Sequence, residues 1–522
     1  MDERIVVVGG GAMGAGIAAV ASRAGYRVAI VEPDARALAR ARERAPEADF
    51  FTEVPEDDTA VLAIEAVPER LEAKVAVFTA MEQRLPHAVL ATNTSSLCVR
   101  EIANASGSPE RVIGLHFFNP PEKMALVEIV RAPSTGENAL ALARRFVEQI
   151  AKTGIVTADT PGFVVNRVAR PFYLQALLAL VAQVAPVDEL DALARGMGFR
   201  MGPFELMDFI GLDVNLATSE SIYERTQYER LAPVEMQRAL VAQGRLGRKS
   251  GAGFYSYDTK PPRIDLHRVP RAAPDARERV VVLGAGGLAD EMTSSIAEHF
   301  APVTRVERDD ELEDLTTAAT ILVDVGDGSS DRAAAIERLD ASLPPECVIF
   351  VDAYASDPDE CAKRMAYPDR LIGYGILGSL ERQAGVEIVD SDAASDDTLA
   401  LAQEMFEAIG HGVALVANVP GLFLGRVVGG IVNEAVAAVH EGVASAEDVD
   451  TAMKLGTNYP LGPIEWGREI GGGRIARILR RLAEREGEAF LPNRTLWVLD
   501  VEDRSQVEAM EEPVSWLPSM DT

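Results

Sequence analysis

Cysteine and long apolar runs are both scarce in this chain of 522 residues. The three cysteines, Cys98, Cys347 and Cys361, show no spacing typical of metal ligands or disulfides. We therefore expect no metal site, and ordinary packing of these thiols in a reduced cytoplasm. The longest apolar run, residues 173–185, is too short and too interrupted to cross a bilayer. Met1 leads within a few residues into a strand, so we also expect no secretory signal.

Positive charge is scarce as well. The chain has 51 Lys and Arg residues against 81 Asp and Glu residues, which gives a net charge of −30. Nucleic acid and anionic membranes both require clustered positive charge, so neither is an expected partner. The composition is otherwise that of a globular protein with room for roughly three or four domains.

A dinucleotide-binding fingerprint opens the chain. An apolar strand at 4–8 is followed by a glycine-rich turn, a helix that ends near Arg23 and a second strand that ends at Glu32. This order of strand, turn, helix, strand and acid is typical of a Rossmann unit that binds NAD. The residues of the turn that we expect to contact the cofactor are Gly9, Gly11, Ala12, Met13 and Gly14.

Each conspicuous residue of the fingerprint has a physical task. Gly9 permits the tight turn, Gly11 lets the backbone approach the pyrophosphate, and Gly14 lets the helix pack closely on the strand. The helix N-terminus offers unpaired N–H groups to the phosphates. Glu32 lies where a carboxylate accepts hydrogen bonds from both ribose hydroxyls and repels a 2′-phosphate, so the sequence favours NAD over NADP.

Further strands at 60–66 and 88–92 alternate with a helical segment, which predicts a parallel, doubly wound sheet. Ligands bind such sheets beyond the carboxyl ends of the strands, where Ser95 would lie. From spacing alone, Ser95 is equally compatible with a helix cap and with a ligand contact. By the same test, Glu69 and Lys74 fit a solvated helix face.

The segment 114–128 is predicted to form a strand, an Asn-Pro-Pro turn and a second strand. The turn brings its two ends together, so His116 and Glu128 could lie within hydrogen-bond reach. This pair is typical of a general base and the carboxylate that orients it. The alternative is a histidine that is merely satisfied within the core.

These motifs resemble the L-3-hydroxyacyl-CoA dehydrogenase family, and the similarity runs in order from residue 4 to residue 257. The segments that carry it are 9–16, 65–69, 93–97, 114–120, 126–128, 159–167, 201–213 and 244–255. The resemblance implies reversible hydride transfer between C3 of a 3-hydroxyacyl-CoA and NAD. It also implies a place in fatty-acid β-oxidation or phenylacetate breakdown.

The resemblance assigns a role to each matching residue. His116 would take the hydroxyl proton, and Glu128 would orient the imidazole. Ser95 and Asn166 would hold the reacting oxygen and the thioester. The positions that match cofactor contacts of the family are Glu69, Lys74, Ser95, Asn119 and Lys249.

The second half repeats the first in a degraded form. Residues 279–286 repeat the strand and glycine turn, but Asp290 and Glu291 put two carboxylates in the first helical turn, where a pyrophosphate needs bare N–H groups. Gly375 stands in the place of His116 and Gly425 in the place of Asn166. We expect an inactive copy, a duplication that resembles bacterial 3-hydroxybutyryl-CoA and 3-hydroxyadipyl-CoA dehydrogenases.

The expected fold class is a Rossmann-type α/β doubly wound domain followed by an all-α domain, with the pair duplicated and the second Rossmann-like domain reduced. The predicted parts are an NAD-binding domain at 1–158, a helical substrate and dimerisation domain at 159–258, a linker at 259–278, a degenerate Rossmann-like domain at 279–418, a second helical domain at 419–500 and an acidic tail at 501–522.

One departure from the family leaves alternatives open. The family usually carries a long helical arm after the second strand that helps to hold coenzyme A, whereas only residues 34–59 intervene here. The second half could complete the acyl-CoA pocket, or serve as an internal pseudo-dimer partner beside homo-oligomer formation. We expect a short-chain or dicarboxylic acyl-CoA substrate. The alternatives are a dehydrogenase of a free 3-hydroxy acid and a non-catalytic NAD- or acyl-binding protein.

Overall fold

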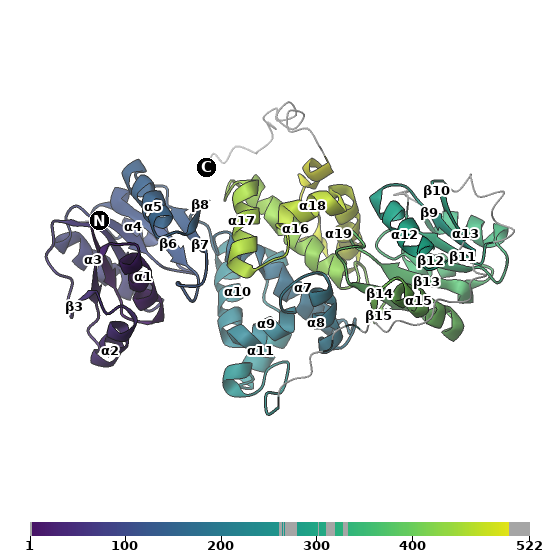
Figure 1. The fold of residues 1–522 in the computed structure, drawn as a ribbon, viewed down its shortest axis with the longest axis horizontal. Helices are drawn as coiled ribbons and strands as arrows, with labels where there is room; N and C mark the ends of the chain where they lie inside the picture. The colour runs from purple at the N-terminus through teal and green to yellow at the C-terminus, as the bar shows by residue number, and fades with distance from the viewer. Residues whose placement is uncertain are drawn as a thin grey trace, which may run out of the picture. The chain divides into compact units, whose positions relative to one another are not determined.

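In the computed structural model, the structure describes residues 3–259, 264, 266, 279–300, 302–308, 319–326 and 332–500. The predicted linker lies largely outside these residues, and the acidic tail lies wholly outside them. The chain divides into two compact units, one of Met1–Arg170, Asp213–Pro233 and Ala438–Gly462, the other of Pro171–Leu212, Val234–Ala437 and Pro463–Thr522. Each unit contains one large sheet, the first drawn from purple to blue and the second from teal to green in Figure 1.

The first sheet has eight strands in the order β3-β2-β1-β4-β5-β6-β7-β8. Neighbouring strands are parallel except β6 and β7, which are antiparallel. The order reverses between β1 and β4, where doubly wound sheets bind their ligands. The strands are β1 (Arg4–Val8), β2 (Arg27–Val31), β3 (Asp49–Phe51), β4 (Ala60–Glu65), β5 (Val89–Thr92), β6 (Val112–Phe117), β7 (Leu126–Arg131) and β8 (Thr153–Ala158).

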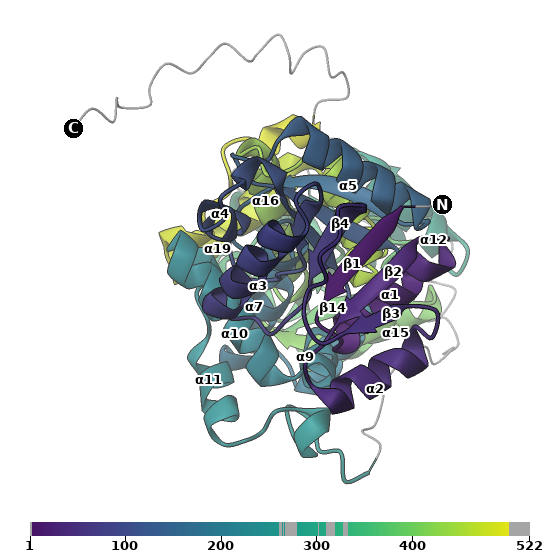
Figure 2. The same ribbon diagram turned by 90° about the vertical axis from the view of Figure 1, so that its left-hand side faces the viewer.

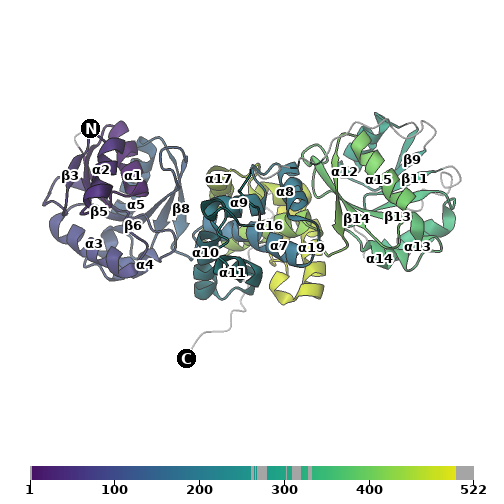
Figure 3. The same cartoon turned by 90° about the horizontal axis from the view of Figure 1, so that it is seen from below.

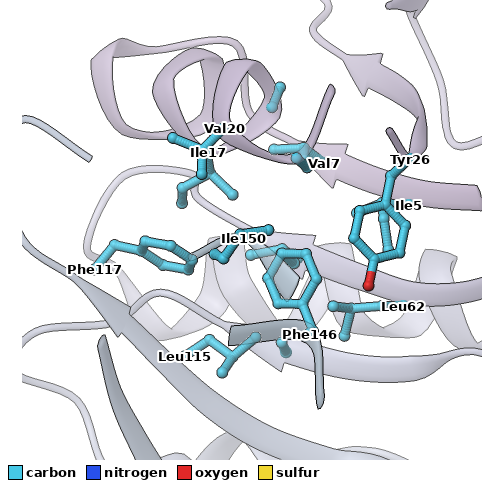
Figure 4. Packing of buried hydrophobic residues seen from close by; sticks show 14 of the residues in the cluster. Ile5, Val7, Ile17, Val20, Tyr26, Leu62, Leu115, Phe117, Phe146 and Ile150 are labelled. Atoms are coloured by element: carbon cyan, nitrogen blue, oxygen red, sulfur yellow. The ribbon is translucent and has the colours of Figure 1, made fainter. Parts of the chain in front are cut away.

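Helices cover both faces of this sheet, with α1 and α5 on one face and α3 and α4 on the other (Figure 2). Successive residues of β1 point into opposite cores. Ile5 and Val7 pack with α1 and α5 (Figure 4), whereas Val6 and Val8 pack with α3 and α4. A strand buried on both sides explains the unbroken apolar run at 5–8. The helices are α1 (Ala12–Arg23), α2 (Ala35–Arg44), α3 (Leu71–Arg84), α4 (Val99–Asn104) and α5 (Glu137–Gln149).

The segment between β2 and β4 contains α2 and β3 and no other named element. Residues 34–59, which stand where the family has a long helical arm, thus form one short helix and one short strand. The Asp34 side chain caps α2 by accepting a hydrogen bond of 2.7 Å from the Ala37 N–H. The shortened segment is therefore an ordered part of the sheet's surface.

The second sheet repeats this architecture with seven strands among the described residues, in the order β10-β9-β11-β12-β13-β14-β15. Again one pair, β13 and β14, is antiparallel. Helices α12 and α15 cover one face, and α13 and α14 the other (Figure 3). The elements are β9 (Val280–Leu283), β10 (Val303–Val306), β11 (Ile321–Asp324), β12 (Val348–Asp352), β13 (Leu371–Gly375), β14 (Gly385–Asp390), β15 (Gly412–Ala417), α12 (Gly287–Ala297), α13 (Arg332–Ser342), α14 (Pro358–Ala362) and α15 (Asp396–Ala408). The predicted fold class, with its reduced second Rossmann-like domain, is confirmed.

A helical region follows each sheet in the sequence. The first contains α6 (Val165–Val168), α7 (Arg170–Val181), α8 (Val187–Gly196), α9 (Pro203–Ile210), α10 (Leu212–Thr226) and α11 (Glu235–Ala242), and the second contains α16 (Leu424–His440), α17 (Ala446–Thr457), α18 (Pro463–Ile470) and α19 (Gly472–Glu486). The two halves exchange helices. In the first unit, α17 packs on β7 and β8 (Figure 1), and in the second unit α8 packs on β14.

The same exchange is seen in two equivalent backbone hydrogen bonds. The Ala158 N–H at the end of β8 donates to the Val443 carbonyl, and the Ala417 N–H at the end of β15 donates to the Val184 carbonyl, each at 2.8 Å. In each compact unit, a helical region of one half therefore supports the sheet of the other half.

Three further observations concern the cysteines, the apolar helices and the possible metal ligands. All three cysteines are buried and none forms a disulfide. Within the described part of the chain, no helix is long and apolar enough to cross a membrane. No group of three His, Cys, Asp or Glu side chains among these residues is arranged to hold a metal ion.

Candidate active site

The glycine turn forms a cradle at the N-terminus of α1. A Cβ atom added to Gly14 would lie 1.8 Å from the Gly9 carbonyl oxygen, so helix and strand approach as closely as only glycine permits. A Cβ on Gly11 would meet no atom within 4 Å, which leaves open space beside the turn. No side chain caps the helix and no acidic residue lies in its first turn, so the N–H groups near Ala12 and Met13 remain available to an anion.

Glu32 follows β2 and lies beside this turn. One carboxylate oxygen accepts a hydrogen bond of 2.8 Å from the Gly10 N–H, and the other accepts one of 2.8 Å from the Asp34 N–H. Two backbone amides therefore fix the carboxylate at the edge of the cradle. Together with the open space at Gly11, this donor and acceptor set fits a dinucleotide with an unmodified adenosine ribose.

The equivalent turn of the second sheet has a different charge. Asp290 lies in the first turn of α12 and pairs with Arg305. The neighbouring Glu291 accepts hydrogen bonds from the Ser379 hydroxyl at 3.0 Å and from the Leu380 N–H at 2.6 Å. Negative charge at a helix N-terminus opposes the binding of a phosphate, so this cradle is the poorer site of the two.

His116 and Glu128 lie directly opposite each other on the antiparallel pair β6 and β7. The Nδ1 atom of His116 is 2.6 Å from Oε2 of Glu128, and both side chains are buried. An ionised carboxylate can only accept, so Nδ1 donates the hydrogen bond, and in a neutral imidazole this leaves the lone pair on Nε2. This is the arrangement of a general base with an orienting acid.

The Glu128 carboxylate is itself fixed from the other side. Its Oε1 accepts hydrogen bonds of 3.0 Å from the Val164 N–H and 2.9 Å from the Val165 N–H, at the start of α6. Two rings flank the imidazole, with centroids 4.7 Å away for Phe118 and 5.7 Å away for Phe163. The histidine therefore has little freedom to turn away from its partner.

The copy shows the same register without the base. Gly375 pairs with Glu387, as His116 pairs with Glu128. The Tyr354 hydroxyl donates to Glu387, and a Cβ on Gly375 would lie 3.2 Å from the Tyr354 ring. Burial raises the pKa of Glu387 to about 7, against hydrogen bonds from Tyr354 and two backbone amides that lower it. Tyrosine has thus taken both the space and the hydrogen bond of the missing histidine.

Lys74 does not lie on a solvated helix face, and that interpretation is wrong. The side chain is 1% exposed, and its ammonium is 2.7 Å from a carboxylate oxygen of Glu65 and 3.1 Å from one of Glu69. Glu65 ends β4 in the interior, where it also accepts a hydrogen bond of 2.7 Å from the Thr92 hydroxyl. A buried carboxylate requires a buried cation, which explains why α3 turns its lysine inward.

Glu69 holds the loop that carries Ser95. Its Oε1 accepts hydrogen bonds from the Thr94 hydroxyl at 2.6 Å and from the Ser95 and Ser96 N–H groups at 2.9 Å. Ser95 itself is exposed and is not the cap of α4, whose N-cap is Cys98. Sequence reasoning missed Glu65 as the anchor of this network, although an acid that ends an apolar strand was a visible signal.

The remaining candidates differ in their positions. Asn166 is half-buried in α6, directly after the two amides that hold Glu128. Asn119 is exposed in the turn after β6, and its peptide bond to Pro120 is cis. Lys249 is exposed in the short 3-10 turn Arg248–Ser250, which belongs to the second compact unit, whereas the cradle and the catalytic pair belong to the first.

Comparison with known families gives two matches. The family model for the NAD binding domain of 3-hydroxyacyl-CoA dehydrogenase matches residues 4–52 and 47–160. The model for the C-terminal domain of 3-hydroxyacyl-CoA dehydrogenase matches twice, at 162–257 and at 421–512. The double match agrees with the internal duplication.

Individual relatives show the same similarity. The chain is 35% identical to a 3-hydroxyadipyl-CoA dehydrogenase of Escherichia coli, over 93% of this chain and 94% of that protein. It is 37% identical to a probable 3-hydroxybutyryl-CoA dehydrogenase of Bacillus subtilis, over 49% of this chain and 98% of that protein. A crystal structure of 3-hydroxybutyryl-CoA dehydrogenase from Escherichia coli superimposes with a TM-score of 0.77 at 32% identity, covering 98% of this chain and 99% of that one.

The Glu69 network predicts a defined dependence of stability on pH. Although burial acts to raise it, Lys74 and the loop donors hold the pKa of Glu69 down from 4.5 to about 2. A depressed pKa stabilises the fold fully above the ordinary value, and this stabilisation is lost as the pH falls toward the folded value. We expect Glu69→Gln to lower the free energy of unfolding at pH 7 by on the order of 2 kcal/mol, after allowance for partial solvent screening.

Urea unfolding of wild type and Glu69→Gln at several pH values tests this. The difference between the two proteins should shrink as the pH falls from 4.5 toward 2. Glu72→Gln removes an exposed charge from the first turn of the adjacent helix α3 and serves as the control. A difference between wild type and Glu69→Gln that stays constant down to low pH would contradict the assignment.

Proposed function

The chain belongs to the 3-hydroxyacyl-CoA dehydrogenase family, NAD-dependent oxidoreductases of 3-hydroxyacyl-CoA, and we propose that its one working site lies in the N-terminal half with His116 as the general base. The observation that carries this assignment is the buried pair of His116 and Glu128, with 2.6 Å between Nδ1 and Oε2. The copy keeps the carboxylate but carries Gly375 opposite it.

In the direction of oxidation, Nε2 of His116 takes the proton of the C3 hydroxyl as the C–H electron pair leaves C3 as hydride. NAD, when bound, supplies the acceptor for that hydride. Glu128 stabilises the imidazolium that forms, because its other oxygen is fixed by the amides at the start of α6. Ser95 and Asn166 are proposed to hold the reacting oxygen and the thioester carbonyl.

The cofactor contacts are proposed from the cradle. Gly9, Gly11 and Gly14 admit the pyrophosphate, and Glu32 accepts from the ribose hydroxyls. Asn119 and Lys249 keep the cofactor roles that the family resemblance implies. Because Lys74 is buried between two carboxylates, we propose that it acts on the site through Glu69.

The substrate is proposed to be a short-chain or dicarboxylic 3-hydroxyacyl-CoA, since similar proteins are named for hydroxybutyryl-CoA and hydroxyadipyl-CoA. A free 3-hydroxy acid is the second candidate, favoured by the single short helix α2 in place of the long arm. The packing of α17 on the first sheet supports the proposal that the second half serves as an internal pseudo-dimer partner.

The domain limits at residues 158, 258, 278, 418 and 500 are also proposed, on the alternation of sheets and helical regions along the chain. We further propose a cytoplasmic location, because three buried cysteines without a disulfide fit a reducing compartment.

The substrate class can be tested by following NADH absorbance with acetoacetyl-CoA, with free acetoacetate, and with NADPH in place of NADH. We expect rapid turnover of the thioester with NADH, because the cradle fits NAD and the family acts on thioesters. Activity on free acetoacetate alone would overturn the CoA assignment. Equal rates with NADPH would overturn the role of Glu32.

Replacement of the base tests the catalytic assignment. We expect His116→Ala to lower kcat by about 10²- to 10⁴-fold, the range of general base catalysis, with NADH affinity unchanged. His87→Ala, which removes an exposed imidazole, is the matched control and should retain wild-type kcat. Near wild-type turnover by His116→Ala would refute the assignment.

Calorimetric titration with NADH should give one site per chain, because the first turn of α12 carries Asp290 where α1 has no acid. Gly14→Ala should abolish this binding, since its Cβ would collide with the Gly9 carbonyl. Two sites per chain, or binding that survives in Gly14→Ala, would show that the second sheet also binds the nucleotide.

A further inference from the structure

A carboxylate of the second half lies against the helix that fixes the catalytic acid. Glu441 lies between α16 and α17 within the first compact unit. Its two carboxylate oxygens accept hydrogen bonds of 2.8 and 2.9 Å from the two terminal nitrogens of Arg167 in α6. The Arg167 side chain is 3% exposed and the Glu441 side chain is 34% exposed, so this bidentate ion pair is buried on the arginine side and reaches solvent on the carboxylate side.

Other contacts define where Glu441 sits. The Tyr228 hydroxyl lies 3.4 Å from one of its oxygens, and a terminal nitrogen of Arg230 lies 4.0 Å from the other. The Arg167 and Arg230 guanidinium groups both lie over the Tyr228 ring. All three of these partners of the carboxylate belong to the first half of the chain.

Arg167 belongs to the same short helix as the groups of the active site. Helix α6 begins at Val165, whose N–H and that of Val164 bind Glu128, and it contains Asn166. A helix of four residues has too few internal hydrogen bonds to hold itself in place. Only Ala169 separates it from α7, so its position comes from that connection and from the groups that it contacts.

The second half contacts α6 at a further point. Helix α17 packs on α6 and β7, and a Cβ added to Gly456 would lie 3.0 Å from Leu126 and 3.0 Å from Val165. The close approach at Gly456 and the ion pair at Glu441 bracket α6.

We propose that Glu441 is a positioning residue for the catalytic pair: by clamping Arg167, the catalytically silent half holds α6 so that its amides fix Glu128 and, through it, His116. The inference rests on the proposed function of that pair. It gives the second half a role in the chemistry of the first without contact to substrate or cofactor.

The copy supplies an internal comparison. The connection between α16 and α17 is equivalent to the connection between α7 and α8. Gly442 in the first and Gln183 in the second both have positive φ, at 70° and 56°, and each precedes the residue whose carbonyl accepts a hydrogen bond from the end of a sheet strand. Two residues before Val184, where the second half has Glu441, the first half has Ala182.

The partner of the clamp has also changed in the copy. Arg426 follows Gly425 as Arg167 follows Asn166, but it pairs with Glu486 of its own half at 2.7 Å. The carboxylate Glu441 is therefore present where it contacts the half that has the histidine, and Ala182 stands at the equivalent position facing the half that has none. An ion pair that served only to stabilise the fold would not be expected to occur only beside the half that has the histidine.

Kinetics of Glu441→Gln in the full chain test the proposal, with acetoacetyl-CoA and NADH as substrates. We expect kcat to fall about tenfold or more, since small displacements of catalytic groups cost one to two orders of magnitude. The affinity for NADH should stay within twofold of wild type. The isotope effect with NADH deuterated at the transferred position should rise, because the chemical step becomes slower. Glu441→Asp, which retains the charge, should recover part of kcat.

Glu486→Gln is the matched control, because it removes the carboxylate of the equivalent ion pair in the silent half. It should keep wild-type kcat even if its thermal midpoint falls. Wild-type kcat in Glu441→Gln, or equal losses of kcat in Glu441→Gln and Glu486→Gln, would overturn the positioning role. Absence of turnover in wild type, or full activity of His116→Ala, would instead overturn the proposed function on which the inference rests.

Discussion

A buried carboxylate that must stay charged needs donors on every side, and the site of this protein is arranged around that requirement at Glu128. One oxygen meets the imidazole of His116, and the other meets the Val164 and Val165 amides. These donors come from a strand and from a helix N-terminus that are distant in sequence. The orientation of the base His116 therefore depends on the position of α6 on the sheet, as does the part of the site that α6 forms.

The copy shows what happens when the requirement is relieved. Glu387 keeps its two backbone donors near Phe423 and Leu424, but its third partner is the Tyr354 hydroxyl. A tyrosine there satisfies the carboxylate and fills the space over Gly375, yet it offers no base near neutral pH, because burial and Glu387 raise the pKa of Tyr354 well above its ordinary value. The copy therefore keeps the fold and the buried carboxylate but has no histidine beside it.

Much of the fold and part of the site follow from local sequence. The strand, turn and helix around Gly9 and Gly14 could be predicted because their tasks are fixed within a few residues of one another. The opposition of His116 and Glu128 follows from a hairpin, whose turn sets the register. Lys74 could not be placed in this way, because its burial depends on Glu65 lying beneath α3 at the end of a strand. No spacing along one helix shows a partner on a neighbouring element.

The ion pair of Arg167 and Glu441 was further out of reach, since the two residues are 274 positions apart. To find this pair, one must know that the two halves exchange α17 and α8. No sequence motif indicates that exchange. Once the exchange is known, the differences between the two copies can be explained. At the places of His116 and Asn166 the second half has Gly375 and Gly425, whereas Glu441, also in the second half, pairs with Arg167 of the first half. In a duplicated protein whose halves exchange helices, a residue of one half can therefore support a site in the other half, and its contacts show which site that is.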